Sequence, residues 1–373
     1  MVEISVLADD AIDDRETTAA VARSAFPTLQ ASLIEETPHM LAARHEGSIV
    51  GGTINEVFEA GGATVGLVTW IFTREDARGL RAGEALLEET VEYLETQGCD
   101  VIVAIVEWAN TSSSKLFGSH GFTRTSAGTV ASEYGLGGAA GIWWHAMYWP
   151  ALGYDLWTLG LEAPSAETRT RTRSAGRFLE AVGVNVGLFA LAALTLSLYG
   201  VLEWSLTAVI PAIAAILGIR YLPQFLATMG DGRSWQFWSW GSVTPFAAVF
   251  AAVGWYLPVP GNRAPRSDVW TYRETLPRLG PAAAVSAGGL VGLYGLAHAH
   301  ESVPWLPADV ATVVLAVGWF VVVVDVVVPS FPFDTYNARV VQEWSRPVWA
   351  VLAAVGIVLL GMTGWDLLAA VLG

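Results

Sequence analysis

The charge-free, apolar segments in the second half of this chain constrain its fold more than any other feature. Residues 181–202 contain no charged side chain. At about 1.5 Å of rise per residue, a helix of this length crosses the roughly 30 Å hydrocarbon core of a bilayer. A soluble protein can bury one such segment but not six, so residues 181–373 are predicted to form a polytopic, all-α transmembrane domain. The other five segments lie at about residues 204–227, 236–258, 280–300, 307–329 and 347–372.

The arginines predict the orientation of this domain. A run of them immediately precedes the first apolar segment, which places the N-terminal half on the cytoplasmic side. Segment 236–258 leaves two readings open. Its Trp, Gly and Pro residues suit a re-entrant element, and the linker after it then also lies inside; the alternative is six ordinary spans with a weak charge bias. The arginines concerned are Arg169, Arg171, Arg173 and Arg177 before the first segment, and Arg263, Arg266, Arg273, Arg278, Arg339 and Arg346 after segment 236–258.

The N-terminal half is strongly acidic, with 25 Asp+Glu against 12 Lys+Arg in residues 1–180. This charge would repel nucleic-acid phosphates, so no nucleic-acid partner is expected. Lys115 is the only lysine of the chain. Abundant acids with almost no lysine are typical of proteomes adapted to high salt, which suggests a halophilic archaeon; the alternative is an acidic soluble domain without that adaptation.

The cysteine content and the first residues limit redox chemistry and targeting. Cys99 is the only cysteine, which excludes an intrachain disulfide and a Cys-rich metal site. Because it lies at the start of an apolar strand, we expect a buried thiol rather than a nucleophile. Residues 1–25 are acidic and lack an apolar core segment, so no secretory signal is expected.

Apolar periodicity in residues 1–150 predicts an α+β domain with a mixed sheet flanked by helices. Its clearest helix is residues 82–97, which carries one apolar stripe. A linker is expected at residues 151–180, between this domain and the membrane domain at 181–373. Strands are expected at residues 4–7, 40–45, 48–52, 53–58, 63–72, 100–106 and 141–148, and helices at residues 9–25, 82–97 and 112–118.

A basic turn that contains glycine precedes the helix at 82–97. Residues 78–83 read Arg-Gly-Leu-Arg-Ala-Gly. The free N–H groups of the first helical turn, together with Arg78 and Arg81, form a positive concavity for phosphate oxygens. Because Arg-Gly pairs are common at helix starts, a second motif is needed to identify the ligand.

The second motif, residues 110–122, reads Asn-Thr-Ser-Ser-Ser-Lys-Leu-Phe-Gly-Ser-His-Gly-Phe. Together the two motifs resemble the acetyl-CoA-binding core of the GNAT superfamily of N-acetyltransferases, with its patterns Arg/Gln-x-x-Gly-x-Gly/Ala and Asn-x-x-Ala/Ser-x-x-Leu-Tyr-x-x-x-Gly-Phe. A capped helix that ends in a glycine turn would explain Asn110 and Gly121 but not the whole register. Arg81 replaces the inner glycine of the first pattern, and Phe117 replaces the tyrosine of the second.

The resemblance implies a GNAT-type fold that uses acetyl-CoA as cosubstrate and no metal. It implies that the basic turn holds the pyrophosphate, that Asn110 reaches the pantetheine arm, and that the backbone of residues 70–72 polarises the acetyl carbonyl. In the family the tyrosine often protonates the departing thiolate, which contributes roughly 10²–10⁴-fold, so Phe117 lowers the expected turnover. The implied cofactor-binding residues are Trp70, Ile71, Phe72, Arg78, Gly79, Arg81, Ala82, Gly83, Asn110, Ser113 and Phe117.

Two carboxylates are candidates for the base that deprotonates the incoming amine. Glu107 follows the apolar strand that ends at residue 106, and Glu56 lies on a strand that faces the acceptor in this family. Either side chain also fits a solvated acid of an acid-rich chain. His45 and His120 lie on predicted turns and are expected to be exposed rather than catalytic.

The membrane half carries few polar side chains, of which two groups stand out. His298, His300 and Glu301 invite a metal interpretation, but their spacing is not the His-Glu-x-x-His that puts two ligands on one helical face. Interfacial residues at a helix end explain them more simply. Asp325 lies among valines near the end of an apolar segment, where a carboxylate is costly unless paired. We expect an arginine partner near the cytoplasmic face; a proton or ligand role is the alternative.

A weak second resemblance concerns the same half. Residues 329–334, Pro-Ser-Phe-Pro-Phe-Asp, resemble the last part of site-2 protease-type membrane metalloproteases, in which Asp334 would be the third zinc ligand. Residues 220–226 lie where the first two ligands are expected and contain neither His nor Glu. The resemblance therefore implies a degenerate fold without zinc or proteolysis.

The sequence thus predicts a cytoplasmic GNAT domain tethered to a multi-pass domain of the cell membrane. It would transfer an acetyl or acyl group from acetyl-CoA to an amine by direct attack, with a membrane protein, a lipid amine or a soluble metabolite as acceptor. The competing hypothesis is a non-catalytic acyl-CoA sensor that biases the membrane domain or a partner, which Phe117 and the missing zinc ligands favour. A third makes the membrane half a binding platform for transmembrane segments of other proteins.

Overall fold

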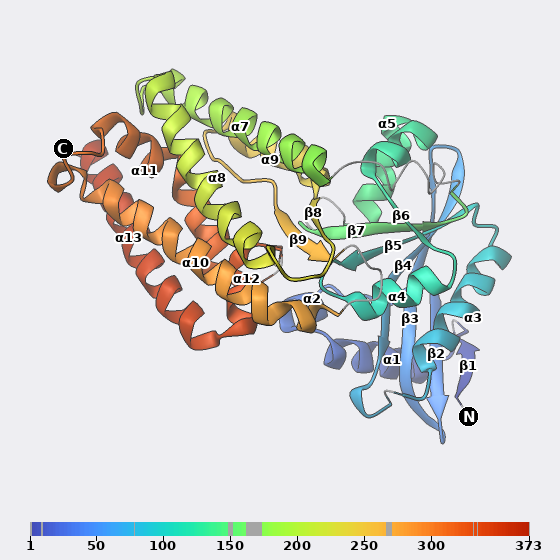
Figure 1. Cartoon of the computed structure of the whole chain (residues 1–373). Coiled ribbons are helices and arrows are strands. Elements are labelled where there is room, and N and C mark those ends of the chain that lie inside the picture. Colours follow the sequence, from blue (N-terminus) through green and yellow to red (C-terminus); the bar gives the residue numbers. More distant parts are fainter. Residues whose placement is uncertain are drawn as a thin grey trace. The chain divides into compact units, whose positions relative to one another are not determined.

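The structure is a computed structural model that describes residues 2–8, 10–77, 79–147, 152–161, 174–265, 271–330, 332–333 and 335–372. The chain forms two compact units, Met1–Glu167 and Thr168–Gly373 (Figure 1). The boundary falls inside the predicted linker, residues 151–180.

A seven-stranded mixed sheet forms the centre of the first unit. Its strands lie in the order β1-β2-β3-β4-β5-β7-β6, with β4 and β5 parallel and the other neighbours antiparallel. The expected fold class, a mixed sheet flanked by helices and followed by a helical region, is confirmed. The strands are β1 (Glu3–Val6), β2 (His39–His45), β3 (Ser48–Ala60), β4 (Ala63–Thr73), β5 (Val101–Glu107), β6 (Thr123–Thr125) and β7 (Tyr154–Leu159).

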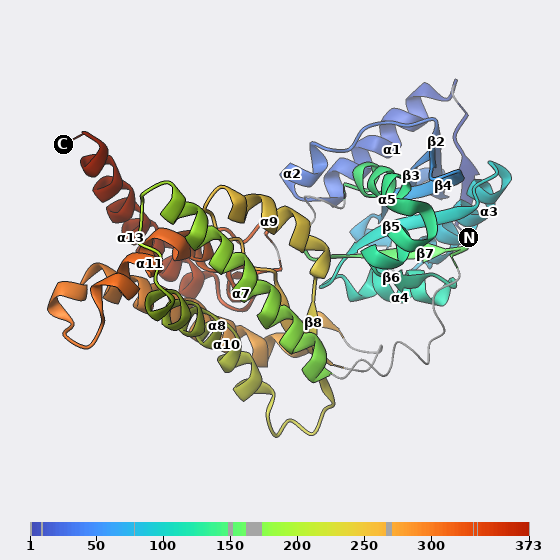
Figure 2. The same cartoon turned by 90° about the horizontal axis from the view of Figure 1, so that it is seen from above.

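Helices cover both faces of this sheet. On one face, Ala19 of α1 packs with Ile54 of β3, and Ile142 of α5 packs with Leu67 of β4. On the other face, α3 and α4 pack against the alternate residues of the strands, such as Val68 (Figure 2). The helices are α1 (Ile12–Ala25), α2 (Thr28–Ala31), α3 (Ala82–Thr96), α4 (Thr111–Ser119) and α5 (Ala127–His145), with a 3-10 turn at Glu75–Ala77.

Strands β4 and β5 separate before either of them ends. Their parallel ladder stops at Val68 and Ala104, yet β4 continues to Thr73 and β5 to Glu107. A β-bulge in the β3–β4 ladder lies at the same level, and bulges bend a strand and increase its twist. Beyond Val68, the backbone groups of β4 that face β5 therefore lie outside the ladder.

The last strand of the first unit is not where the sequence predicted it. The prediction of a strand at residues 141–148 is wrong, because the chain up to His145 forms the end of α5; Tyr148 lies outside the described residues. Apolar side chains three or four residues apart pack this helix on the sheet, namely Ala139, Ile142 and Ala146. The adjacent Trp143 and Trp144 gave the segment a strand-like composition. Strands β6 and β7 complete the sheet instead, and β7 lies within the predicted linker.

The second unit is helical apart from one two-stranded ribbon, which the all-α expectation did not include. Within the described residues, five helices are long and apolar enough to cross a membrane: α7, α8, α10, α11 with its π-helical end, and α13. The elements are α7 (Ser174–Leu198), α8 (Leu206–Thr228), β8 (Trp235–Ser239), α9 (Thr244–Ala252), β9 (Gly261–Pro265), α10 (Tyr272–His298), α11 (Ala308–Val322), the π-helix Val323–Val327, α12 (Asn337–Trp344) and α13 (Arg346–Leu372), with 3-10 turns at Gly241–Val243 and His300–Ser302.

Segment 236–258 is not an ordinary span. It contains most of β8, a 3-10 turn and the nine-residue helix α9. Nine helical residues extend only about 14 Å, less than half the thickness of the hydrocarbon core. The six-span alternative is therefore wrong for this segment.

The second unit buries an ion pair between α8 and the π-helical end of α11. Arg220 donates from Nε to Asp325 Oδ2 at 2.6 Å, and the two side chains are 3% and 0% exposed. Asp325 Oδ1 accepts from the backbone N–H and the side-chain amide of Asn337, at 3.1 and 3.0 Å. The expectation that an arginine pairs with Asp325 is confirmed, and hydrogen bonds engage both carboxylate oxygens.

Polar side chains of α7 and α8 bind β9 and the residues just before it. Asn185 Oδ1 accepts from the backbone N–H of Val259 at 2.9 Å. Gln224 donates from Nε2 to Asn262 Oδ1 at 3.2 Å, and its Oε1 accepts from the backbone N–H of Arg263 at 3.2 Å. These bonds satisfy polar groups of a non-helical segment, whose burial without partners would be costly.

Loss of one partner of the buried ion pair should strongly destabilise the second unit. In Arg220→Met the Asp325 carboxylate stays buried without its cation, and the expected loss is about 3–5 kcal/mol. Thermal unfolding of the full chain purified in detergent measures it. The double variant Arg220→Met/Asp325→Leu should recover most of the loss, because no uncompensated charge remains.

The pair Arg278–Asp231 provides the control. Its N–O distance is 2.8 Å, but the Arg278 side chain is 47% exposed, so Arg278→Met should cost about 1 kcal/mol or less. Equal shifts of the melting temperature for Arg278→Met and Arg220→Met would show that burial does not govern the effect.

Candidate functional site

The turn between β4 and α3 forms one side of the candidate site. Arg78 lies outside the described residues. Gly79 has φ +94°, a conformation that glycine adopts without strain. The first helical hydrogen bond is donated by the N–H of Ala85 to the carbonyl of Arg81, so the three preceding amides, of residues 82–84, point out of the helix end.

Arg81, which replaces the inner glycine of the family pattern, is accommodated by its backbone. It has φ 57° and ψ 22°, the left-handed conformation, directly before α3. Its side chain is 81% exposed and donates from Nε to Glu84 Oε2 at 2.6 Å. The guanidinium thus lies at the positive end of the helix macrodipole, next to the outward-pointing amides.

Open space lies beside the same helix end. An added Cβ at Gly83 would have its nearest neighbour, Leu116 Cδ2, 3.8 Å away, and at Gly79 it would meet nothing within 4 Å. Ala82, in contrast, is buried against the sheet. Gly83 therefore lets a ligand approach the backbone closely, while Ala82 packs.

The start of α4 follows the carboxyl end of β5. Asn110 is the N-cap residue, and its Oδ1 accepts from the backbone N–H of Ser113 at 3.1 Å. Asn110 therefore caps α4, the structural role expected of an Asn at a helix start. The side chain is exposed, and its Nδ2 group remains available for a ligand.

Phe117 belongs to the core. It is 2% exposed, and its ring meets that of Phe122 edge to face at a centroid distance of 5.0 Å. The same cluster contains Val68 and Ala104, the last paired residues of β4 and β5. Phe117 therefore supports the point at which the strands separate, and it has no hydroxyl with which to protonate a leaving group.

The predicted carbonyl-polarising strand residues lie at the opening between β4 and β5. Trp70, Ile71 and Phe72 all follow Val68 on β4. Trp70 is half-buried and its ring meets Phe26 edge to face at a centroid distance of 4.8 Å. The structure thus brings these residues, the turn before α3 and the start of α4 to the carboxyl ends of the two separating strands.

The two predicted bases lie on the face of the sheet that α1 and α5 cover, opposite the face covered by α3 and α4. Glu107 is half-buried at the end of β5 and pairs in register with Tyr154 of β7. Glu56 accepts a hydrogen bond from His145 Nδ1 at 2.7 Å. Sequence reasoning missed His145, because the segment that carries it was read as a strand. An apolar spacing of three and four residues before His145 is the signal that would have indicated a helix.

The remaining candidate residues include His45, His120 and His298. The expectation that His45 and His120 are exposed is wrong, because both are half-buried; His120 Nδ1 lies 2.8 Å from the carbonyl of Leu116. His298 Nε2 lies 3.0 Å from Thr363 Oγ1 of α13. Asp334 lies outside the described residues. Among the described residues, no group of three or more His, Cys, Asp and Glu side chains is placed to hold a metal ion.

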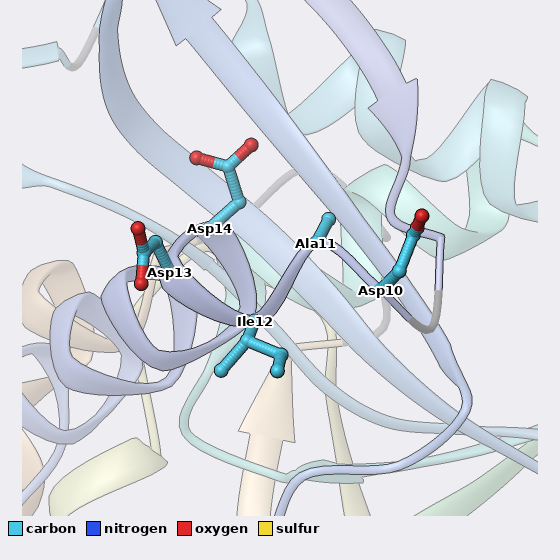
Figure 3. A pocket seen from close by; sticks show the side chains of 5 residues that line it. All are labelled: Asp10, Ala11, Ile12, Asp13 and Asp14. Carbon is cyan, nitrogen blue, oxygen red and sulfur yellow. The ribbon is translucent and has the colours of Figure 1, made fainter.

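A hollow at the start of α1 does not suit the cofactor. It is lined by Asp10, Ala11, Ile12, Asp13 and Asp14, and Ile12 points away from the three carboxylates (Figure 3). These carboxylates would repel the phosphates of a nucleotide cofactor. The turn before α3 offers backbone donors, and its cation Arg81 is paired with a single carboxylate, that of Glu84.

Comparison with known proteins bears on the first unit. Residues 9–122 match the model of the Acetyltransferase (GNAT) family. Among solved structures that match, the ribosomal-protein-S18-alanine N-acetyltransferase of Escherichia coli is 18% identical, with 44% of this chain and 97% of that chain covered and a TM-score of 0.31. The IAA acetyltransferase of Bacillus cereus ATCC 14579 has 19% identity, coverages of 34% and 79%, and a TM-score of 0.28. The NatC complex bound to Gag peptide and CoA is 14% identical, with 34% of this chain and 86% of that chain covered and a TM-score of 0.30. No curated protein matches.

The family match identifies the first unit as containing a GNAT acetyltransferase domain, at residues 9–122. This range includes β4, the turn, α3, β5 and α4, the elements that form the candidate site. The identities and TM-scores of the individual structures are too low to indicate a substrate. The match ends at residue 122, so it has no bearing on the second unit.

Cys99 should behave as a weakly reactive thiol. It is half-buried, and burial raises the pKa of the thiol, with Asp100 and Glu59 acting in the same direction. Because the thiolate is the reactive form, alkylation of the folded protein by iodoacetamide should rise at a higher pH than alkylation of the unfolded chain. Mass spectrometry of the alkylated fraction measures both profiles. If alkylation of the folded protein rises at the lower pH, the raised pKa of the Cys99 thiol is contradicted.

Proposed function

We propose that this chain is a membrane-tethered N-acetyltransferase that moves an acetyl or acyl group from acetyl-CoA to an amine. The observation that carries the proposal is the convergence of three elements at the carboxyl ends of β4 and β5. These are the separated strands, the amide-rich start of α3 and the start of α4, and all lie within the GNAT family match.

The residues present suit acetyl-CoA. A pyrophosphate binds well where backbone amides, a positive charge and room for close approach coincide. The start of α3 supplies the amides, Arg81 supplies the charge, and Gly79 and Gly83 leave the room. Arg78 would add a second cation, and Ala82 seats the helix. The exposed amide of Asn110, beside Ser113, would meet the pantetheine arm at the other side of the opening.

The reaction we propose is direct attack of the amine on the thioester. The backbone of Trp70, Ile71 and Phe72 would donate to the carbonyl oxygen as negative charge develops there. Holding amine and thioester in reactive geometry contributes several kcal/mol. Removal of the proton from the amine would involve the carboxylates of Glu56 and Glu107, which lie on the α1/α5 face.

A location at the cytoplasmic face of a membrane is the second part of the proposal. With five spans and a non-spanning ribbon segment, the connections α8–α10 and α11–α13 fall on the same side as the start of α7. Those parts carry the arginines, while residues 199–205 and 299–307 on the other side carry Glu203 and Glu301 and no Lys or Arg. This distribution follows the positive-inside rule.

The buried Phe117 ring favours one competing function, a sensor that binds acyl-CoA without turnover. Radiolabelled acetyl-CoA offered to the purified full chain in high salt, with a panel of amines, separates the two. Label transferred to an amine supports the enzyme. Tight binding with no transfer to any amine would overturn it in favour of the sensor, and absence of binding would overturn both.

A negative charge at Gly83 should weaken cosubstrate binding without harming the fold. Acids in the first turn of a helix are favourable for stability, and an added Cβ has room at this position. In Gly83→Glu we expect the Kd for acetyl-CoA to rise at least about tenfold through repulsion of the phosphates, as measured by isothermal titration calorimetry.

Gly128 offers a matched control for that variant. It is the second residue of α5 as Gly83 is of α3, and a Cβ there also has room, with Ser126 Oγ at 3.8 Å. Gly128→Glu should leave the Kd unchanged. Equal weakening by the two substitutions would place the phosphate site elsewhere.

The proposed orientation predicts opposite labelling at the two ends of α10. In a Cys99→Ser background, Arg273→Cys at its start should be protected from a membrane-impermeant maleimide in intact cells. Glu301→Cys, just beyond its end, should be labelled, since both positions are exposed in the second unit. The reverse pattern would invert the topology and place the first unit outside.

A further inference from the structure

One polar cluster near the candidate site is not explained by cosubstrate binding. His145, the last residue of α5, contacts Glu56 of β3 through Nδ1 and Oε1 at 2.7 Å. Its ring stacks on Phe58 of the same strand, with centroids 3.9 Å apart and planes 10° apart. The two polar side chains are 36% and 40% exposed, so the imidazole is held in place and still accessible.

We propose that His145 accepts the proton of the attacking amine, and that Glu56 is a positioning residue acting through His145. The inference rests on the proposed acetyl transfer. A carboxylate only accepts hydrogen bonds, so it holds the imidazole hydrogen on Nδ1 and leaves Nε2 with the free lone pair. Stacking on Phe58 fixes the plane of the ring, which sets the direction of that lone pair.

The cluster lies where an acceptor amine could reach the opening between β4 and β5. Glu56 pairs in register with Leu67, the residue directly before the last paired residue of β4, Val68. Alternation along the strands puts Glu56, Leu67 and Glu107 on the face that α1 and α5 cover. His145 therefore stands on the side of the sheet opposite α3 and α4, so an amine and the cosubstrate can approach the opening from different faces.

The charges around His145 suit a cationic amine. From β3, Glu56 faces the imidazole, while Glu59 points to the other face and accepts from Thr64 Oγ1. Strand β4 carries no charged side chain over Ala63–Thr73. From β5 and β7, Glu107 and the Tyr154 hydroxyl lie on the same face as His145, and α5 itself carries one acid, Glu133. Together, β3, β4, β5, β7 and α5 carry carboxylates and no Lys or Arg, which attracts ammonium groups. Arg15 and Arg23 of α1, which covers the same face, donate to the carbonyls of Thr37 and Ile34.

An ammonium acceptor gives one proton to Nε2 of His145 and becomes a neutral amine. Its nitrogen attacks the thioester carbon; the C–N bond forms, the C–S bond breaks, and the thiolate leaves. The second amine proton passes to the thiolate through solvent, and the imidazolium returns its proton to water. The products are the amide, CoA thiol and one proton.

His145→Gln tests the inference, because glutamine keeps a hydrogen-bond donor beside Glu56 but cannot take up the proton. With a diamine such as spermidine as the probe acceptor, we expect kcat/KM to fall about 100-fold or more. The fall of activity in acid that a histidine base imposes should disappear from the pH profile. The Kd for acetyl-CoA should not change. Glu56→Gln should lower kcat about tenfold and shift that acid limb, which a purely structural contact would not do.

Matched controls lie on the same elements. Glu59→Gln removes an exposed acid from β3 on the opposite face, and His45→Gln removes a half-buried imidazole from β2; both should retain full activity and the wild-type pH profile. Unchanged kcat/KM and an unchanged acid limb in His145→Gln would overturn the inference. If the wild type binds acetyl-CoA but acetylates no amine, the proposed function fails instead. If the wild type acetylates only neutral amines, the proposal that the acceptor is a cationic amine is overturned.

Discussion

The early end of the β4–β5 ladder, at Val68 and Ala104, is the constraint on which the first unit depends. Two parallel strands deliver their carboxyl ends to the same edge of a sheet, and the loops that follow them meet there. Here those loops are the turn before α3 and the start of α4. Because the ladder has already ended, the backbone groups of β4 and β5 that face one another at this meeting point are not paired with each other. Phe117 and Phe122 pack in the same core cluster as Val68 and Ala104, the last paired residues of the two strands.

The second unit is organised by a different requirement, namely that polar groups buried among apolar helices find partners. Arg220, Asp325 and Asn337 satisfy one another, and Asn185 and Gln224 satisfy the non-helical segment between α8 and α10. With both oxygens engaged, the Asp325 carboxylate holds three segments together. Arg220 supplies the positive charge that this buried carboxylate needs.

The sequence predicted those features that short-range patterns determine. The stripe of α3, the apolar run of β5 and the capped start of α4 are local, and the structure has them within one or two residues of their expected bounds. It failed where the pattern was ambiguous, as at α5, whose paired tryptophans resemble strand composition. It also could not choose which arginine meets Asp325, because Arg220 lies 105 residues away along the chain. The pairing of His145 with Glu56, 89 residues apart, is of the same kind: only tertiary packing brings them together.

The two faces of the sheet divide the chemistry that we propose. On the α3/α4 face, the amides and Arg81 would bind phosphates, but the position of the family's tyrosine is occupied by a buried ring that cannot donate a proton. Protonation of the departing thiolate is then left to solvent. The remaining proton transfer that side chains can control is removal of a proton from the amine, on the α1/α5 face. In the mechanism that we propose, the accessible imidazole of His145 would contribute more to catalysis than it would in a domain that also has the tyrosine. Acetyl transfer is therefore compatible with Phe117 at the position of that tyrosine.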